Sequence, residues 1–430
     1  MADVLRGVEA NSVEMALSLP RDSLDEAPRR RPLRPAASLD EHFEHAVAHR
    51  GHGEIVTDSA PSERADRGGL PIASLCYVPA AMKLAIIPGD GIGIDVTREA
   101  VKVLRTLDRG GALSLDLMTF PWGADHYLST GETVPPGAFE DLSSHYDAIF
   151  MGAFGDPRVP DMKHAADILL GTRFRLDLYV NYRPVRCLDD RLSPLKGYSA
   201  RDIDFVVFRE NTEGAYVGAG GNFKKGTPDE VAIQEDVSTR KGVERIVRHA
   251  FEFARTTGRR RVTMSDKSNA MRFVGDLWQR VFAEVSSEYS EIESSHLYVD
   301  ALCLQLIKDP RPFDVIVTNN MFGDIVTDLC AALQGGLGMA ASGNIHPGRV
   351  SMFEPVHGSA PKYAGTGRAN PFGAILTAAL MLEHLGRKKE AEAVERAVAS
   401  CVAARRCTPD VGGSLSTGEA GDSVCERLTG

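Results

Sequence analysis

Two aspartates four residues apart are the clearest sign of metal chemistry in this sequence. Asp324 and Asp328 occur in NNMFGDIVTDL, and this spacing places both carboxylates on one face of a helix. Like charges repel there, so a cation between them would explain the pair, although two solvated surface acids are the simpler reading of an isolated pair. The apolar flanks favour the cation, and oxygen ligands indicate Mg²⁺ or Mn²⁺. Asp300, in LYVDAL, is a third carboxylate after an apolar stretch.

Three arginines form a second candidate group, because the planar guanidinium binds a carboxylate at two points. Arg173 and Arg183 lie ten residues apart in LLGTRFRLDLYVNYRPVR, and Arg209 begins RENTEGAY. Any one of them could form an ordinary surface salt bridge. Together, near the ends of apolar elements, they could bind a di- or tricarboxylate.

Two further residues are candidates for proton transfer. Lys267 lies in SDKSN just after a predicted strand, and Tyr216 lies seven residues after Arg209. A lysine in an enclosed site can have a lowered pKa and act as a base, and a tyrosine can act as an acid. Each residue type is more often structural or exposed, so neither role follows from one residue alone.

Two glycine-containing segments raise the question of a nucleotide. Residues 88–93, PGDGIG, follow the first predicted strand, but the glycines read GxGxG and no acidic residue ends a second strand about 20 residues on, so the dinucleotide-binding fingerprint is absent. His357 lies in FEPVHGSAPKYAGTGRANP, residues 353–371. Backbone N–H groups of such a loop can hold phosphate or adenine, although an ordinary long loop has the same composition.

Apolar runs alternate with helical patterns from Met82 onward, which predicts an α/β protein with a largely parallel sheet. Residues 216–236 break this alternation and predict a protruding hairpin or arm. The expected strands are 83–88, 146–151, 204–208, 261–265 and 314–318. The expected helices are 95–107, 241–256, 275–288, 324–333, 372–385 and 390–405.

The overall composition excludes several classes of protein. The chain has 430 residues, 49 of them basic and 59 acidic, and this acidic balance argues against a nucleic acid as the main partner. No apolar run approaches the roughly 18–20 residues needed to span a bilayer. The seven scattered cysteines, without a CxxC pair, fit a reducing compartment. We therefore expect a cytoplasmic protein without membrane or nucleic-acid partners.

Residues 1–81 differ from the rest of the chain. They contain an Arg/Pro cluster at 28–35, four histidines between 42 and 52, and no sustained hydrophobic periodicity. They match neither a secretory signal nor an acid-poor transit peptide. We expect a disordered N-terminal extension, with Met82 as the working start of the protein.

Taken together, the motifs resemble the β-decarboxylating dehydrogenases, the isocitrate/isopropylmalate dehydrogenase family. The similarity runs from Met82 to near the C-terminus and rests on IPGDGIG, LLxxRxxLDLxxNxRP, RENTEG, SDKSN, YVDAL, NxFGDIxTDL and EPVHGSAP followed by NP. It implies a non-Rossmann, two-domain α/β fold of the isopropylmalate/isocitrate dehydrogenase type. The cofactor-side domain would comprise 82–178 plus 335–430, and the dimerisation and metal/substrate domain 179–334. It also implies a homodimer whose active sites each take residues from both subunits.

The resemblance assigns a role to each candidate residue. The reaction would be oxidation of a 2-hydroxy acid by NAD or NADP, followed by loss of CO₂ from a β-carboxylate. Arg173, Arg183 and Arg209 would bind the substrate carboxylates. Asp324 and Asp328, with Asp300 of the other subunit, would hold Mg²⁺ or Mn²⁺ and position the substrate. Lys267 of the neighbouring subunit would take the hydroxyl proton, and Tyr216 would return a proton to carbon. The implied cofactor-binding residues are His357, Gly358, Ser359, Ala360, Lys362, Tyr363 and Asn370.

The identity of the substrate depends on the residues just before Arg173. Leu169 and Leu170 form an apolar patch one helical turn earlier, which suits an isopropyl group and favours 3-isopropylmalate, a leucine precursor. An acid at Asp167 would repel the third carboxylate of isocitrate. Ala166 and Ala270 stand where isopropylmalate enzymes usually have a glutamate and a branched apolar residue. Isocitrate, homoisocitrate and tartrate/malate-type substrates therefore stay open.

The cofactor residues carry conflicting signals. Lys362-Tyr363 is the pair typical of NADP-linked isocitrate relatives, whereas Pro409 and Gly413 follow the NAD-type pattern. We expect NAD, with NADP as the alternative. Two rivals of other classes are a regulatory subunit without catalysis, which tends to lose the groups that this chain keeps, and a nucleic-acid-binding protein that uses the Arg/Pro segment.

Overall fold

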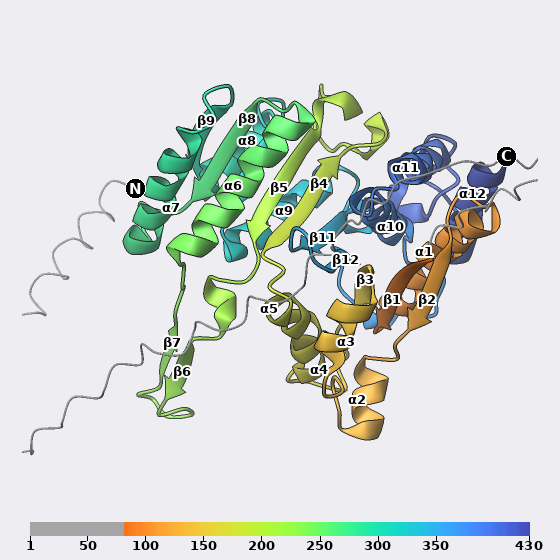
Figure 1. Cartoon of the computed structure of the whole chain (residues 1–430), viewed down its shortest axis with the longest axis horizontal. Coiled ribbons are helices and arrows are strands. Elements are labelled where there is room, and N and C mark those ends of the chain that lie inside the picture. Colours follow the sequence, from red (N-terminus) through yellow and green to blue (C-terminus); the bar gives the residue numbers. More distant parts are fainter. Residues whose placement is uncertain (1–80) are drawn as a thin grey trace, which may run out of the picture. The chain divides into compact units, whose positions relative to one another are not determined.

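A ten-stranded mixed sheet runs through residues 81–430, the part of the chain that the computed structural model describes (Figure 1). The strand order is β2-β1-β3-β12-β11-β4-β5-β10-β8-β9. Six of the nine pairings are parallel, and the three antiparallel ones involve β12, β11, β4 and β5 in the middle. The largely parallel α/β sheet is therefore confirmed. The extension predicted over 1–81, with its histidines, lies outside the described residues except for its last residue.

The strands of this sheet include all five that the sequence predicts, with ends shifted by a few residues. Their bounds are β1 Met82–Gly89, β2 Leu115–Thr119, β3 Ala148–Ala153, β4 Val180–Arg186, β5 Asp204–Glu210, β8 Arg261–Asp266, β9 Glu293–Tyr298, β10 Val315–Thr318, β11 Ala341–Ile345 and β12 Ser351–Pro355.

The helices include the six predicted ones. Their bounds are α1 Ile92–Arg109, α2 Ala124–Thr130, α3 Ala138–His145, α4 Lys163–Ala165, α5 Gly171–Arg175, α6 Arg240–Thr257, α7 Arg272–Ser286, α8 Val299–Lys308, α9 Asn320–Leu333, α10 Phe372–His384, α11 Lys388–Ala403 and α12 Thr417–Thr429. Between α4 and α5 the chain forms one turn of π-helix, Ala166–Leu170.

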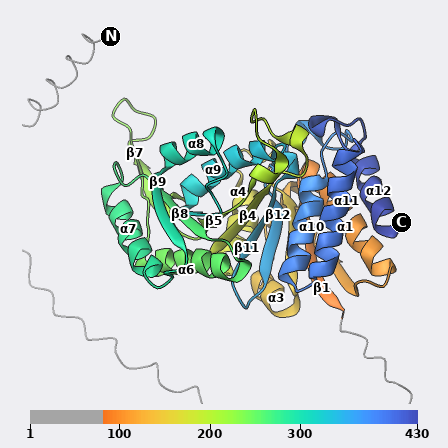
Figure 2. The ribbon, with the colours of Figure 1, turned by 90° about the horizontal axis from the view of Figure 1, so that it is seen from above.

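The buried core is divided between two parts of the sequence. Two apolar clusters draw their residues from 84–178 and 339–424, and two others from 180–345. Helix α1 packs against α10 and α12, so the two ends of the described chain share a core, as Figure 2 shows. The two domains expected over 82–178 plus 335–430 and over 179–334 stay a prediction.

The predicted arm is a hairpin of two antiparallel strands, β6 Gly220–Phe223 and β7 Val231–Gln234, separate from the main sheet (Figure 1). All eight strand residues are exposed. Phe223 and Val231 face each other in register, and each is at least half exposed. The arm therefore lacks apolar cover within the described chain, and an isolated hairpin of this kind is only marginally stable in water.

Candidate active site

The carboxyl ends of four parallel strands position most of the candidate residues. β5, β10, β8 and β9 are parallel neighbours, so their carboxyl ends meet at one edge of the sheet, where α/β proteins usually bind ligands. Arg209 lies near the end of β5, and Lys267 directly follows β8. Asp300 lies in the first turn of α8 just after β9, and α9 starts after β10. The topology therefore gathers residues that are far apart in sequence.

Helix α9 turns its two aspartates away from the core. The Asn319 side chain caps the helix by accepting a hydrogen bond of 2.9 Å from the Phe322 amide. The opposite face packs on the core through side chains spaced three or four apart: Phe322, Val326, Cys330 and Leu333. Asp324 and Asp328 therefore share the face that points toward the strand ends.

Asp324 is the centre of a polar cluster. Arg209 and Arg183 both donate to its Oδ1, the latter at 3.3 Å, and the Tyr216 hydroxyl donates to its Oδ2 at 2.9 Å. Burial raises the pKa of Asp324, but the charges of Arg209 and Arg183 outweigh burial and lower that pKa below its usual value. Asp324 is therefore an anion that holds two arginines and a tyrosine in place.

The three predicted arginines are almost completely buried, with at most 7% of each exposed. Burial and the nearby charges of Arg183 and Arg173 lower the pKa of Arg209 to about 9. Arg173 donates to Glu354 Oε1 at 2.7 Å. The Nε atoms of Arg173 and Arg183 have no hydrogen-bond partner within residues 81–430. The three guanidinium groups thus form ion pairs with two carboxylates. One positive charge and the unpaired Nε donors remain available to an anionic ligand.

Asp328 is suited to bind a cation, but the single chain does not supply a complete set of ligands for it. Burial and the charge of Asp324 raise its pKa, which reflects the repulsion that a cation would relieve. Among the described residues, no group of three or more His, Cys, Asp or Glu side chains is arranged to hold a metal ion. The two aspartates of α9 offer hard oxygen donors suited to Mg²⁺ or Mn²⁺, but they need at least one further ligand.

Lys267 and Asp300 form a separate pair. The lysine Nζ lies 2.6 Å from Asp300 Oδ1, and this hydrogen bond lowers the pKa of Asp300. Two-thirds of the Asp300 side chain is exposed. In the described part of the chain, no hydrogen bond or ion pair connects this pair to Asp324. The structure thus brings together the arginines, Tyr216 and α9, and leaves Lys267 and Asp300 as a second, solvent-facing group.

The segment after β12 contains a buried imidazole with an unpaired nitrogen. His357 Nδ1 lies 3.1 Å from the Gly358 carbonyl oxygen, and its buried Nε2 has no partner in residues 81–430. Burial lowers the pKa of His357, so the ring is neutral and can accept a hydrogen bond at Nε2. A ligand with an N–H donor, such as the amino group of adenine, fits this position.

The glycines of PGDGIG have a packing role. Gly91 has φ +57°, and a Cβ there would lie 2.1 Å from the Ser359 carbonyl oxygen. That oxygen accepts a hydrogen bond of 2.8 Å from the Ile92 amide. A Cβ at Gly93 would lie 2.5 Å from the Ala153 nitrogen. The motif thus allows α1 to begin close against β3 and the His357 segment.

The remaining predicted cofactor residues differ in exposure: three are exposed, one is half-buried and two are buried. Ala360 adopts a left-handed conformation, φ +36°, just before the short turn that carries Lys362 and Tyr363. The Lys362 ammonium lies 4.7 Å from the centre of the Tyr363 ring, and the Arg368 guanidinium lies 5.6 Å from it. Asn370 is buried and donates to Asp410 Oδ2 at 2.9 Å. Two cations therefore flank one exposed ring.

The residues predicted to set substrate specificity lie on the π-helical turn before Arg173. Leu169 and Leu170 are half-buried there, and such turns are frequent at functional sites. Asp167 pairs with Lys163 and accepts a hydrogen bond of 2.9 Å from Thr133. Its charge is therefore partly balanced, which weakens the predicted repulsion of a third carboxylate.

Sequence reasoning missed Glu354, which positions Arg173. Its Oε1 accepts hydrogen bonds from Arg173 and from Asn344 Nδ2, the latter at 2.8 Å. Glu354 stands in the EPVHGSAP motif, so its position in the sequence was known. Its partner was not, because a contact between residues 181 positions apart depends on the order of the strands.

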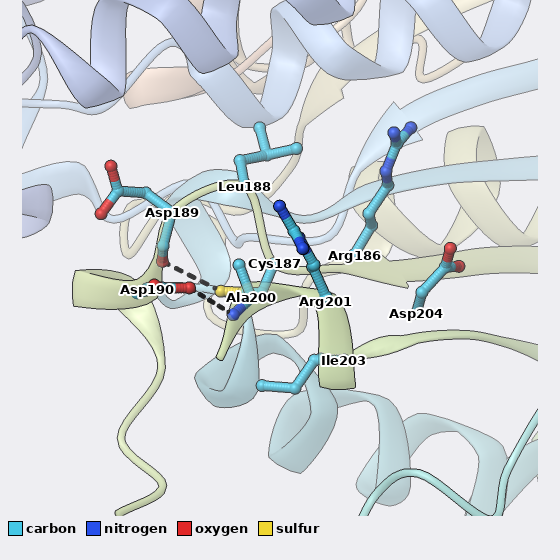
Figure 3. A pocket seen from close by; sticks show the side chains of 9 residues that line it. All are labelled: Arg186, Cys187, Leu188, Asp189, Asp190, Ala200, Arg201, Ile203 and Asp204. Atoms are coloured by element: carbon cyan, nitrogen blue, oxygen red, sulfur yellow. Dashed lines mark hydrogen bonds between the residues drawn. The ribbon is translucent and has the colours of Figure 1, made fainter. Parts of the chain in front are cut away.

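A separate hollow of about 610 Å³ contains none of the predicted site residues (Figure 3). It lies where β4 ends and β5 begins, and both acidic and basic side chains line it, among them Arg186, Asp189, Asp190 and Arg201. In the β4–β5 ladder Arg186 pairs with Asp204, at the opposite end from Arg209. This hollow is therefore distinct from the candidate site.

Comparison with known proteins gives a consistent result. Residues 83–424 match the family model described as isocitrate/isopropylmalate dehydrogenase. The chain is 47% identical over 349 residues to a 3-isopropylmalate dehydrogenase of Thermobifida fusca, covering 81% of this chain and 98% of that protein. It is 46% identical to the enzyme of that name from Streptomyces coelicolor, covering 81% and 99%.

A solved structure shows the same fold. The crystal structure of isocitrate dehydrogenase from Methylococcus capsulatus superposes with a TM-score of 0.74 at 34% identity, covering 81% of this chain and all of the other. No helix in the described part of the chain has the length and apolar character that crossing a membrane requires.

Proposed function

The chain belongs to the isocitrate/isopropylmalate dehydrogenase family, and we propose that it catalyses the metal-dependent oxidative decarboxylation of 3-isopropylmalate, a reaction of leucine biosynthesis. The observation that carries this proposal is the arginine cluster. Arg173, Arg183 and Arg209 are buried beside only two paired carboxylates and retain two unpaired Nε donors. A substrate with two carboxylates supplies the missing negative charge.

The substrate side chain is assigned from the turn before Arg173. Leu169 and Leu170 are only half-buried, so part of their apolar surface is available to a ligand. Burial of an isopropyl group there contributes roughly 2 kcal/mol, at about 0.8 kcal/mol per methylene-sized group. The two curated relatives named above carry the same activity in their names. Isocitrate is the second candidate, because the compared crystal structure is of an isocitrate dehydrogenase.

Asp324, Asp328 and Asp300 of a second subunit would hold Mg²⁺ or Mn²⁺. When bound, the cation lowers the pKa of the substrate hydroxyl and stabilises negative charge on that oxygen after CO₂ leaves. Within the protein, Lys267 accepts the hydroxyl proton as a neutral amine and becomes an ammonium, and Asp300, whose Oδ1 lies 2.6 Å from Nζ, orients its side chain. Tyr216 then donates a proton to the carbon that has lost CO₂. Burial and the Asp324 charge raise the pKa of Tyr216, which keeps the phenol protonated for this role.

NAD is the proposed hydride acceptor. His357 Nε2 and the backbone of residues 357–360 would hold the adenosine part, and the Pro409 and Gly413 pattern supports a cofactor without a 2′-phosphate. NADP is the second candidate, because Lys362 and Arg368 flank Tyr363 and together could bind a 2′-phosphate. A shared site in a cytoplasmic homodimer is part of the proposal. The separation of Lys267 from Asp324 and the exposed arm support it.

A substrate panel tests this function. With Mg²⁺ or Mn²⁺ and NAD, kcat/KM for 3-isopropylmalate should exceed that for isocitrate, homoisocitrate, malate and tartrate. The same panel with NADP decides the cofactor. A higher kcat/KM for any other acid would overturn the proposed substrate, and a preference for NADP would overturn the proposed cofactor.

A further inference from the structure

An aromatic groove of about 240 Å³ lies on the sheet between α6 and α10. Its floor is formed by β4, β5, β11 and β12, and its walls by the two helices. Six of its lining residues carry the argument: Tyr182, Phe208, His249, Phe253, Phe353 and His384. The volume is below the roughly 300–1,000 Å³ of pockets for drug-sized ligands, so it suits a molecule of one or two rings.

The rings of the groove already pack as an aromatic cluster. Tyr182 stacks on Phe208 with ring centres 5.4 Å apart, and Phe253 meets Phe208 edge-on at 5.0 Å. The imidazole of His249 also meets Phe208 edge-on, at 4.9 Å. On the other side, the His384 ring lies 5.3 Å from Phe353. A further aromatic ring can join such a cluster by stacking or edge contact.

Three polar groups face this groove without a protein partner. Within residues 81–430, the Tyr182 hydroxyl and the rings of His249 and His384 make no hydrogen bond, and none of these polar atoms is fully enclosed by the protein. Burial, followed by the neighbouring His384, lowers the pKa of His249 to about 4, and burial also lowers the pKa of His384. Both imidazoles are therefore neutral near pH 7, and each offers one donor and one acceptor.

The charge around the groove selects the type of ligand. Glu383 is the one charged side chain among its lining residues, and no lysine or arginine lines it. An anion would therefore meet a carboxylate without a compensating cation. Substrate, product and dinucleotide are all anions, so the groove is unsuited to each of them.

We propose that this groove binds a small neutral aromatic molecule carrying a hydrogen-bond donor, at a site separate from the substrate and cofactor sites. The ring would lie against Phe253 and Tyr182, the half-buried rings of the groove, and the donor would reach the exposed His384 imidazole. A molecule with an N–H or O–H group on one or two fused rings, of the indole or phenol class, meets these requirements.

The separation from the active site follows from the pleat of the strands. Tyr182 precedes Arg183 on β4, and Phe208 precedes Arg209 on β5. Successive side chains of a strand point to opposite faces, so the groove lies on the reverse of the sheet from the arginine cluster. Tyr182 and Phe208 are also directly paired across the two strands. The site therefore does not depend on the proposed function.

Calorimetric titration of the full chain with indole tests the proposal. Saturable binding with one site per chain is expected, and it should persist when NAD and 3-isopropylmalate are present at saturating concentrations. Loss of binding in the presence of NAD would mean that indole occupies the adenine site, and would overturn the proposal. Absence of saturable heat up to millimolar indole would overturn it as well. Benzoate should bind more weakly than indole, and equal binding would contradict the charge argument.

Two variants and a control assign the binding to the groove. His384→Ala, on the exposed rim, should weaken indole binding about fivefold through the lost hydrogen bond and ring contact. Phe253→Ala should weaken it about tenfold. His145→Ala, an exposed histidine on α3, should leave it unchanged. Unaltered affinity in His384→Ala would rule out this groove even if Phe253→Ala failed to fold.

Discussion

The Asp324 carboxylate has two roles in this account. In the single chain it holds Arg183, Arg209 and Tyr216, whereas the proposed function also requires it to bind a cation beside Asp328. Both are met if the arginines turn their donors to the substrate carboxylates when substrate and metal enter together. The buried arginine cluster is thus positioned before binding, and Asp324 is its temporary counter-ion.

Tyr216 provides the first prediction at this scale. Tyr216→Phe removes the only proton that its side chain can donate and keeps the ring under the Arg209 guanidinium, 5.2 Å away. General acid–base catalysis contributes about 10²–10⁴-fold, so the variant should exchange the carbon-bound protons of the 2-oxo acid product with D₂O at least about 100-fold more slowly. NMR of that product in D₂O measures the exchange. An exchange rate like that of the wild type would remove Tyr216 from the mechanism.

Glu210 provides a pH prediction. Burial raises the pKa of this carboxyl from 4.5 to about 7. Between these values the folded protein keeps the proton that the unfolded chain has lost, so this residue makes stability fall as pH rises through that window. In Glu210→Gln, the loss of unfolding free energy between about pH 5 and pH 7.5 should be smaller than in the wild type. Denaturant unfolding at both pH values measures it, with the exposed Glu132→Gln as control. Equal losses in Glu210→Gln and wild type would contradict the buried, protonated state.

At the scale of elements, the π-helical turn links the specificity residues to Arg173. Its five residues, Ala166–Leu170, directly precede α5, so the leucines and the arginine lie on one continuous helical segment. Leu169 also packs on the neighbouring apolar core, whereas Leu170 belongs to no buried cluster of the described chain. Leu170 is therefore the better candidate for contact with a substrate side chain.

The prediction for this element is a loss of selectivity. Leu170→Ala should lower kcat/KM for 3-isopropylmalate about tenfold, or roughly 1.4 kcal/mol of lost apolar contact. The value for malate, which has no isopropyl group, should hardly change. Leu128→Ala, on the exposed side of α2, is the matched control. An equal loss for both substrates would mean that Leu170 acts on folding and not on selectivity.

Elements with strong periodicity could be predicted from the sequence to within a few residues. The helices predicted at 241–256 and 372–385 correspond to α6 and α10. The apolar residues of α6 follow the helical repeat, and those of α10 occur on all sides, as in a buried helix. The strand β9, ESSHLY, was not predicted, because none of its residues is buried and its sequence shows no apolar run. β11 and β12 contain glycine, serine and proline and are strands because their neighbours pair with them.

The candidate site was predictable in its residues and less so in its contacts. The motifs named Arg209, Tyr216 and Asp324, and these do meet. The pairing of Arg173 with Glu354 was not foreseen, since it depends on the strand order. The glycines of PGDGIG were left open between a nucleotide and a simple turn, and only the approach of Ser359 and Ala153 reveals their packing role.

At the scale of the whole molecule, the separation of Lys267 from Asp324 becomes a prediction about assembly. Lys267→Met and Asp324→Asn should each be inactive as homodimers. If each site combines Asp324 of one subunit with Lys267 of the other, a mixed dimer has one intact site. Co-expression with random pairing should then restore about a quarter of wild-type activity. As a control, the two variants are purified separately and mixed without subunit exchange, and this mixture should stay inactive. If co-expression restores no activity, both residues act in the same subunit's site.

The central claim is that this chain oxidises 3-isopropylmalate and releases CO₂ from it at one site. The most direct test is to measure reduced NAD and CO₂ together in one reaction with Mg²⁺ or Mn²⁺. We predict equal amounts of the two products, dependent on the metal and absent in Lys267→Met. Reduced NAD without CO₂, or no turnover of 3-isopropylmalate by a folded, metal-loaded dimer, would contradict the account.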